Sequence, residues 1–132
     1  MHKRYISMGA ALAGLAVALG AFGAHGLKKI VPPEAVDTFQ TGVQYQMIHA
    51  LALILAGILV EKFSSRFLSY AAICFGLGIL LFSGSLYLLT YLKATSTIGL
   101  GGWGLITPVG GLAFILGWVF VVWAVVKAPY KG

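Results

Sequence analysis

The sequence predicts an all-α membrane protein: a bundle of four transmembrane helices, with a short amphipathic or projecting helix before the second span. Composition is the first reason, because 60% of the 132 residues are hydrophobic and only 9% are charged. Soluble domains carry about 25% charged residues. Length is the second reason, because four apolar runs each approach or exceed the roughly 20 residues that a helix needs to cross a bilayer. The charged residues lie at the ends of these runs, as expected for segments that border a membrane.

The chain is predicted to form a single domain, residues 1–132, with spans at about 5–24, 41–60, 67–92 and 108–126. In a soluble protein its net charge of +6 would suggest a nucleic-acid partner. Here the basic residues flank apolar runs, so membrane topology explains them. The expected surroundings are the lipid bilayer, and no nucleic-acid partner is expected.

The first apolar run, residues 5–24, follows a short basic segment and has the look of a signal peptide. Signal peptides usually carry an apolar region of about 7–15 residues, whereas this run is long enough to span a bilayer. No convincing small-x-small cleavage site precedes His25. We therefore expect the run to be retained as the first transmembrane helix.

This first helix carries a stripe of small residues that lets another backbone approach closely. The stripe consists of Gly9, Ala13, Ala16, Gly20 and Gly23. Close packing along it predicts a helix at the centre of the bundle. Gly26 follows as the predicted C-terminal cap of this helix.

Pro32 and Pro33 then break the chain, and Pro33 suits the first position of a new helix. A helix from Pro33 to Lys62 would be about 45 Å long, which exceeds the ~30 Å hydrocarbon core. Residues 33–40 are therefore expected either to project into the headgroups or to bend along the membrane surface. The embedded part is expected to begin near Thr41.

The second span has two different faces when it is wound as a helix. The small and polar face consists of Gly42, Tyr45, Gln46, His49, Ala52, Leu53 and Ala56. The opposite face, of Met47, Leu51, Ile54, Leu55 and Ile58, is apolar enough for lipid. Companion helices must cover the polar face. We expect His49 to point into the bundle and to contact the polar face of the third span, at Ser83, at Tyr87 or at a backbone carbonyl.

In the fourth span, Thr107 suits a helix cap and Pro108 suits the first helical position. Gly110 and Gly117 follow at heptad spacing. Like the stripe on the first helix, they are predicted to be sites of close helix packing.

Four spans place the N-terminus, the turn at residues 61–66 and the C-terminus on one side of the membrane. Six basic residues border that side and three border the other: Lys3, Arg4, Lys62, Arg66, Lys127 and Lys131 against Lys28, Lys29 and Lys93. Loops rich in basic residues face the cytoplasm. Both termini are therefore predicted to be cytoplasmic.

Four segments resemble the signatures of a known family. They read GAFGAHGL at residues 20–27, TGVQYQMIH at 41–49, LFSGSLY at 81–87 and ITPVGGL at 106–112. In this order they are similar to domain-of-unknown-function family 423, small multi-pass membrane proteins that are YgdD-like and YwdK-like in bacteria, with a eukaryotic relative called transmembrane protein 256. The resemblance covers nearly the whole chain. It implies a cytoplasmic-membrane location and about four helices, but no reaction, substrate or catalytic residue.

His49 is the one ionisable side chain clearly inside a predicted span. With Tyr45, Gln46, Ser83 and Tyr87 it makes up the predicted polar centre of the bundle, and two interpretations of that centre are open. Intramembrane titratable residues are costly and often functional, which suggests a proton relay or a ligand site. Alternatively, a neutral imidazole makes a structural hydrogen bond between helices.

Other chemistries find little support. His25 and the single cysteine, Cys74, lie in opposite halves of the bilayer, which leaves too few ligands for a closed zinc site. The Gly-rich segments near Gly20 and Gly110 follow no strand and do not match a phosphate-binding loop. No serine–histidine–acid set falls inside one compartment. We therefore expect no catalytic residue, no metal, no cofactor and no enzymatic activity.

Two functions from different classes are compatible with these observations. The first is a noncatalytic accessory, scaffold or oligomer-forming bundle, whose partner is a second copy or another membrane protein. The second is a transporter or channel component for a small solute, a proton or a lipid, with His49 in the pathway. The small-residue stripes and the scarcity of titratable groups favour the first function.

Overall fold

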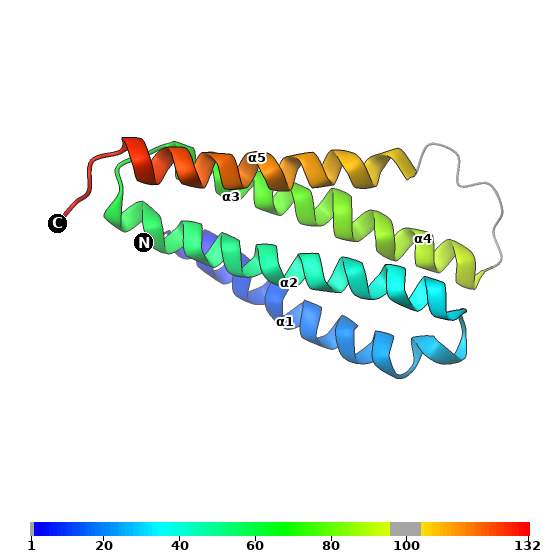
Figure 1. Cartoon of the computed structure of the whole chain (residues 1–132). Coiled ribbons are helices and arrows are strands. Elements are labelled where there is room, and N and C mark those ends of the chain that lie inside the picture. Colours follow the sequence, from blue (N-terminus) through cyan, green and yellow to red (C-terminus); the bar gives the residue numbers. More distant parts are fainter. Residues whose placement is uncertain (1, 96–103) are drawn as a thin grey trace.

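The computed structural model describes residues 2–95 and 104–132, and nearly all of them are helical. Four helical segments are long and apolar enough to cross a membrane: Lys3–Lys29, Pro33–Lys62, Phe67–Ala94 and Ile106–Lys127. Figure 1 shows them packed lengthwise, with successive segments running in opposite directions. The predicted all-α bundle of four spans is therefore confirmed.

The first two spans form a helical hairpin. Helix α1 (Lys3–Ala24) is followed by the short 3₁₀ helix η1 (Leu27–Lys29), and α2 (Pro33–Lys62) returns along α1. Gly26 is not the C-terminal cap of α1 that the sequence suggested, because His25 takes that position and Gly26, with a φ of −68°, starts η1. The reason is that the chain continues directly into η1, which needs a right-handed backbone at this position.

Helix α2, and not α1, is the central helix, so the predicted position of α1 is wrong. Helix α1 packs mainly against α2, whereas α2 also contacts both halves of the third span. The only buried residues of α1 are Gly9, Ala16 and Gly23, all of which belong to the small-residue stripe. A stripe this narrow can pack against one neighbouring helix. The remaining faces of α1 expose large apolar side chains such as Leu15 and Val17.

The stripe on α1 brings two backbones close together. A Cβ atom added at Gly9 would lie 2.6 Å from the carbonyl oxygen of Ala50 in α2. At the other end of the hairpin, the Gln40 amide donates a hydrogen bond of 3.2 Å to the carbonyl oxygen of Gly20. A Cβ atom added at Gly23 would meet that same Gln40 side chain. Small residues are therefore needed along the whole contact between α1 and α2.

Residues 33–40 continue α2 without a break, so they do not form the surface-lying helix that was one of the two expectations. Pro33 occupies the first turn of α2, as expected, with Glu34 beside it. The apolar side of this segment is buried in a cluster that consists of Leu27, Val31, Ala35, Val36 and Phe39. The connection between α1 and α2 packs on the first turns of α2. Because this contact buries the apolar side of residues 33–40, the segment can continue straight and does not have to lie on the membrane surface.

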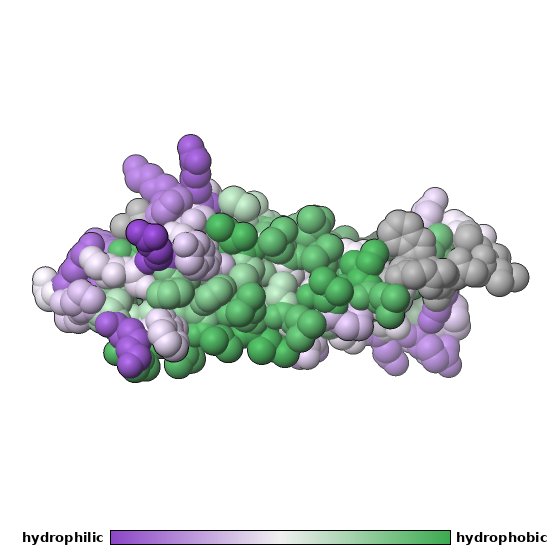
Figure 2. All heavy atoms as spheres, turned by 90° about the horizontal axis from the view of Figure 1, so that it is seen from above, coloured by the Kyte–Doolittle hydropathy of each residue, from purple (hydrophilic) through white to green (hydrophobic). Residues whose placement is uncertain are grey.

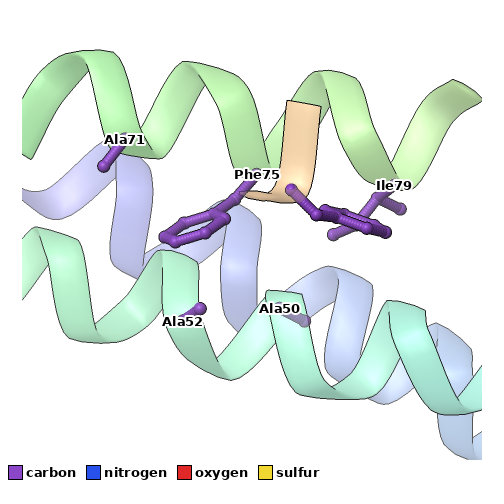
Figure 3. Close-up of a cluster of buried hydrophobic side chains, with 6 residues drawn as sticks. Ala50, Ala52, Ala71, Phe75 and Ile79 are labelled. Carbon is purple, nitrogen blue, oxygen red and sulfur yellow. The ribbon is translucent and has the colours of Figure 1, made fainter. Parts of the chain in front are cut away.

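The third span contains a π-helical turn that was not predicted. Helix α3 (Phe67–Gly78) passes into the π helix η2 (Ile79–Ser83) and then into α4 (Gly84–Ala94). A π turn holds more residues than an α-helical turn, so the residues on its two sides face different directions. Figure 3 shows Phe75 of α3 and Ile79 of η2 between this span and Ala50 and Ala52 of α2.

Helix α5 (Ile106–Lys127) starts earlier than predicted, with Leu105 at its N-cap, so Thr107 is not the cap. The Thr107 hydroxyl instead forms a short hydrogen bond with the Ser85 hydroxyl of α4. In an apolar environment, a partner on a neighbouring helix satisfies a hydroxyl group that would otherwise face hydrocarbon.

The two glycines of α5 lie where it meets the third span. A Cβ atom at Gly110 would collide with the backbone of Phe82 in η2. A Cβ atom at Gly117 would lie 2.6 Å from the ring of Phe75 in α3. Both glycines let α5 approach the third span closely.

Both ends of the chain lie at the same end of the bundle as the α2–α3 turn (Figure 1). The His2 N–H donates to the Gly57 carbonyl, and the Lys131 N–H donates to the Lys62 carbonyl, each at 2.8 Å. Figure 2 shows apolar residues along the middle of the molecule and hydrophilic residues towards its ends. This is the surface pattern of a bundle whose long axis crosses the bilayer.

Candidate functional site

Gln46 joins three helices at the centre of the bundle. Its side chain is 2% exposed and extends from α2. Its amide nitrogen donates to the Leu12 carbonyl of α1 at 2.8 Å, and its amide oxygen accepts a hydrogen bond of 2.6 Å from the Tyr87 hydroxyl of α4. Because both the nitrogen and the oxygen of its amide are bonded, Gln46 crosslinks α1, α2 and α4.

The buried hydroxyl groups of the third span are bonded in the same way. Ser83 donates to the Gly42 carbonyl at 2.6 Å, so its hydroxyl spans the gap between η2 and α2. Thr90 donates to the Leu86 carbonyl of its own helix at 2.9 Å. Hydroxyl groups in helices commonly return to a nearby carbonyl in this manner. The hydroxyl groups of Ser83 and Thr90 therefore have hydrogen-bond acceptors on α2 and on the backbone of their own span.

His49 points into the bundle and is 4% exposed, but its partners are not those expected for it. Its Nε2 atom lies 3.1 Å from the Trp118 indole nitrogen of α5, and its Nδ1 atom lies 2.7 Å from the Tyr45 carbonyl of its own helix. Two of the expected partners, Ser83 and Tyr87, are bonded to Gly42 and Gln46 instead, and the third, a backbone carbonyl, belongs to α2 itself and not to the third span. The π turn places Ser83 opposite Gly42, two turns away from His49.

The hydrogen bonds of His49 define its protonation state. An indole N–H can only donate, so His49 Nε2 must accept. A carbonyl can only accept, so Nδ1 must carry the proton that it shares with Tyr45. The imidazole is therefore neutral with both nitrogens satisfied, and it stacks on Phe114 with ring centroids 3.5 Å apart. A second proton on Nε2 would break the bond to Trp118.

Trp118 is the residue of this site that the sequence analysis missed. A signal for it was present, because an indole N–H inside the membrane needs a hydrogen-bond partner. Trp118 lies in the middle of an apolar span that offers no acceptor of its own apart from its backbone. An acceptor on another helix was therefore needed, and His49 is an imidazole at a similar depth in α2.

A cavity of about 660 Å³ opens between α2 and α5, beside His49. We call it the α2–α5 groove. Its lining residues are Gln44, Tyr45, Ile48, His49, Phe82, Pro108, Gly111, Leu112, Phe114, Ile115 and Trp118. Aromatic and aliphatic side chains dominate its walls, and Tyr45 at its edge is 39% exposed. Such a groove has the size and apolar character of a binding site.

The groove holds few polar groups, and half of them are already bonded. His49 and Trp118 bond to each other, which leaves the Gln44 amide and the Tyr45 hydroxyl. Within residues 2–95 and 104–132, no three His, Cys, Asp or Glu side chains group closely enough to hold a metal ion. The geometry of the groove suits binding to apolar surface with one or two hydrogen bonds at its edge.

Replacing Gln46 by Leu should lower the free energy of unfolding by about 1–3 kcal/mol, because the Leu12 carbonyl and the Tyr87 hydroxyl both lose their partner in a dry interior. The measurement is thermal melting of the purified protein in mild detergent. The matched control on the same helix is Leu51→Ile, because Leu51 is 55% exposed and faces lipid. Equal melting of both variants would show that the Gln46 crosslink is not part of the fold.

Comparison with known proteins identifies the family. The family model described as "Protein of unknown function (DUF423)" matches residues 19–111. The UPF0382 membrane protein YwdK of Bacillus subtilis is 44% identical over 126 residues, which covers 95% of this chain and 98% of the relative. The UPF0382 inner membrane protein YgdD of Escherichia coli K12 is 37% identical, with coverage of 100% of this chain and 97% of the relative. No solved structure matches the chain. The chain belongs to the DUF423 family of membrane proteins.

Proposed function

We propose that the chain is a noncatalytic membrane bundle that acts by associating with other membrane-embedded chains, as an accessory, scaffold or oligomer-forming protein. The observation that carries this proposal is the neutral, doubly bonded state of His49. A proton relay needs a group that gains and loses a proton as it works. The buried imidazole of His49 is instead part of the bonding between α2 and α5.

The α2–α5 groove supports association rather than conduction. It lies on the side of the bundle, between two helices that expose Ile48, Leu112 and Ile115 around it. Helices in bilayers associate through close packing and interhelical hydrogen bonds. A side-facing groove with a polar edge offers both of these to another helix.

One observation favours the alternative, a transporter or channel component for a small solute, a proton or a lipid. His49 and Trp118 form part of the wall of the groove, so an occupant would contact a hydrogen-bonded pair that joins α2 and α5. A ligand that competed for the Trp118 N–H would release His49. The following experiment separates the two functions.

The protein, with an affinity tag, is purified in mild detergent from the membranes of its own cells, and its complexes are measured by native mass spectrometry. Association predicts a protein partner, either a different chain or a second copy, at a fixed stoichiometry. A monomer that retains a stoichiometric solute or lipid would contradict the proposal and favour the alternative. An untagged strain processed in parallel controls for nonspecific capture.

We further propose that both termini face the cytoplasm. The end of the bundle that holds the termini carries six basic residues and one acid, whereas the other end carries three basic residues and two acids. In a Cys74→Ala background, Ser65→Cys should react with a membrane-impermeant thiol reagent only after the membrane is opened. Lys29→Cys should react in intact cells. The reverse labelling pattern would invert the proposed orientation, and labelling of both from one side would contradict the four-span topology.

A further inference from the structure

We propose that the α2–α5 groove binds a second copy of this chain in a symmetric dimer, with Gln44 of each copy at the seam. This inference rests on the proposed function and names the partner. It starts from a difference between two neighbouring glutamines of α2. The nitrogen and the oxygen of the Gln46 amide are both bonded inside the bundle, whereas Gln44 points to the groove.

Gln44 and Tyr45 are the groove residues with unused hydrogen-bonding groups. In the part of the chain that the structure describes, no side-chain or backbone group bonds to the Gln44 amide or to the Tyr45 hydroxyl. The ring of Tyr45 lies against Phe82, with centroids 4.6 Å apart, which places the side chain at the edge of the groove. Together the two side chains form a polar edge on an otherwise apolar wall.

This polar edge lies within the membrane, where leaving hydrogen-bonding groups without partners costs free energy. Helix α5 has 22 residues and is therefore about 33 Å long, close to the ~30 Å thickness of the hydrocarbon core. Gln44 lines the groove together with Pro108, Gly111 and Leu112, which belong to the first two turns of α5. Gln44 thus lies below the membrane surface, where an amide without a partner is unfavourable.

A second copy supplies the missing partner because of its symmetry. Two copies inserted in the same orientation are related by a two-fold axis along the membrane normal, so each residue lies at the same depth in both. Gln44 of one copy then faces Gln44 of the other. A carboxamide carries both donors and an acceptor, so two of them satisfy each other. Tyr45 can donate to the same amide oxygen.

The shape of the surface fits the same arrangement. Gln44 and Ile48 lie one turn apart on the exposed side of α2 and form a ridge beside the groove. A two-fold axis near Gln44 lays the ridge of each copy into the groove of the other, in the manner of helix ridges that pack into grooves.

Disulfide crosslinking in native membranes tests the dimer. Full-length protein with Cys74→Ser and Gln44→Cys should form a covalent dimer on mild oxidation, because the two thiols meet at the axis. The matched control is Val17→Cys, which is 63% exposed on α1. The contact of Gly20 with Val43 puts Val17 at a depth similar to that of Gln44. The control should remain monomeric under the same conditions.

A second variant tests the hydrogen bond without a thiol. Gln44→Leu should retain the fold and weaken the dimer about tenfold, as measured by the dissociation constant for labelled copies in liposomes at increasing dilution. Crosslinking at Val17 but not at Gln44, or an unchanged dissociation constant for Gln44→Leu, would overturn the proposal. If Gln44→Cys instead crosslinks to a different protein, the partner is not a second copy, yet association as the function stands. A monomer without any partner would overturn both.

Discussion

Gly110→Ala is expected to destabilise the protein by about 3 kcal/mol, at the upper end of the range for overpacked interiors. The added methyl group would meet the backbone nitrogen and Cα of Phe82 in the π turn. A backbone cannot turn aside as a flexible side chain can. Helix α5 would have to move away from η2, and the hydrogen bond between Thr107 and Ser85 would be strained with it. The measurement is the melting temperature in detergent.

The neighbouring glycine provides the control. A Cβ atom at Gly111 meets only the Phe82 ring at 3.8 Å, which is an ordinary contact. Gly111→Ala should therefore raise the melting temperature, because alanine favours a helix over glycine by up to about 1 kcal/mol. If both variants melt alike, α5 does not pack against η2 as described.

His49→Leu is expected to cost about 1–3 kcal/mol, because the Trp118 N–H then lies within the membrane without an acceptor. Trp118→Phe removes the donor and leaves His49 Nε2 unpaired. The double variant should cost less than the two single variants together, since removing both partners leaves no unpaired group. A coupling of about 0.6–1.7 kcal/mol is the range seen for such bonds in membranes. Additive costs would contradict the bond between the two side chains.

The same position separates structure from proton transport. If His49 relays protons, then His49→Gln and His49→Leu should both abolish pH-dependent proton flux in liposomes, because neither side chain titrates near neutral pH. The structural role predicts no such flux in the unmodified protein. It also predicts that His49→Gln melts closer to the unmodified protein than His49→Leu does, because the amide can still accept from Trp118.

Hydropathy and helical periodicity were sufficient to predict the four spans and most of the two faces of α2. Two assignments were wrong: Tyr45, predicted on the covered face, is 39% exposed at the groove, and Ile54, predicted on the lipid face, packs against Gly9 of α1. The buried side of α2 holds Gly42, Gln46 and His49, and its exposed side holds Leu51 and Leu55, as the 100° rotation per residue predicts. The central helix was not predictable in this way. A stripe of small residues shows that a helix has a close neighbour, but it does not show how many neighbours surround that helix.

The partners of the polar residues depended on a feature with no visible periodicity. The π turn at Ile79–Ser83 aligns Ser83 with Gly42 and leaves Tyr87 opposite Gln46. Without knowledge of this turn, the third span cannot be set in register with α2. His49 was then assigned to the wrong helix, although its burial followed directly from its position on the helical wheel.

The order of helix contacts along the chain has a consequence for biosynthesis. Helix α1 packs on α2, and α5 packs on the third span, so each hairpin consists of neighbours in sequence. The first hairpin can assemble as soon as Lys62 has left the ribosome, with the Gln46 amide nitrogen already bonded to Leu12. The Gln46 oxygen and the His49 ring must wait for Tyr87 and Trp118. A nascent chain stopped after the first hairpin should therefore expose these groups to lipid, and it should be the form that membrane chaperones and proteases recognise.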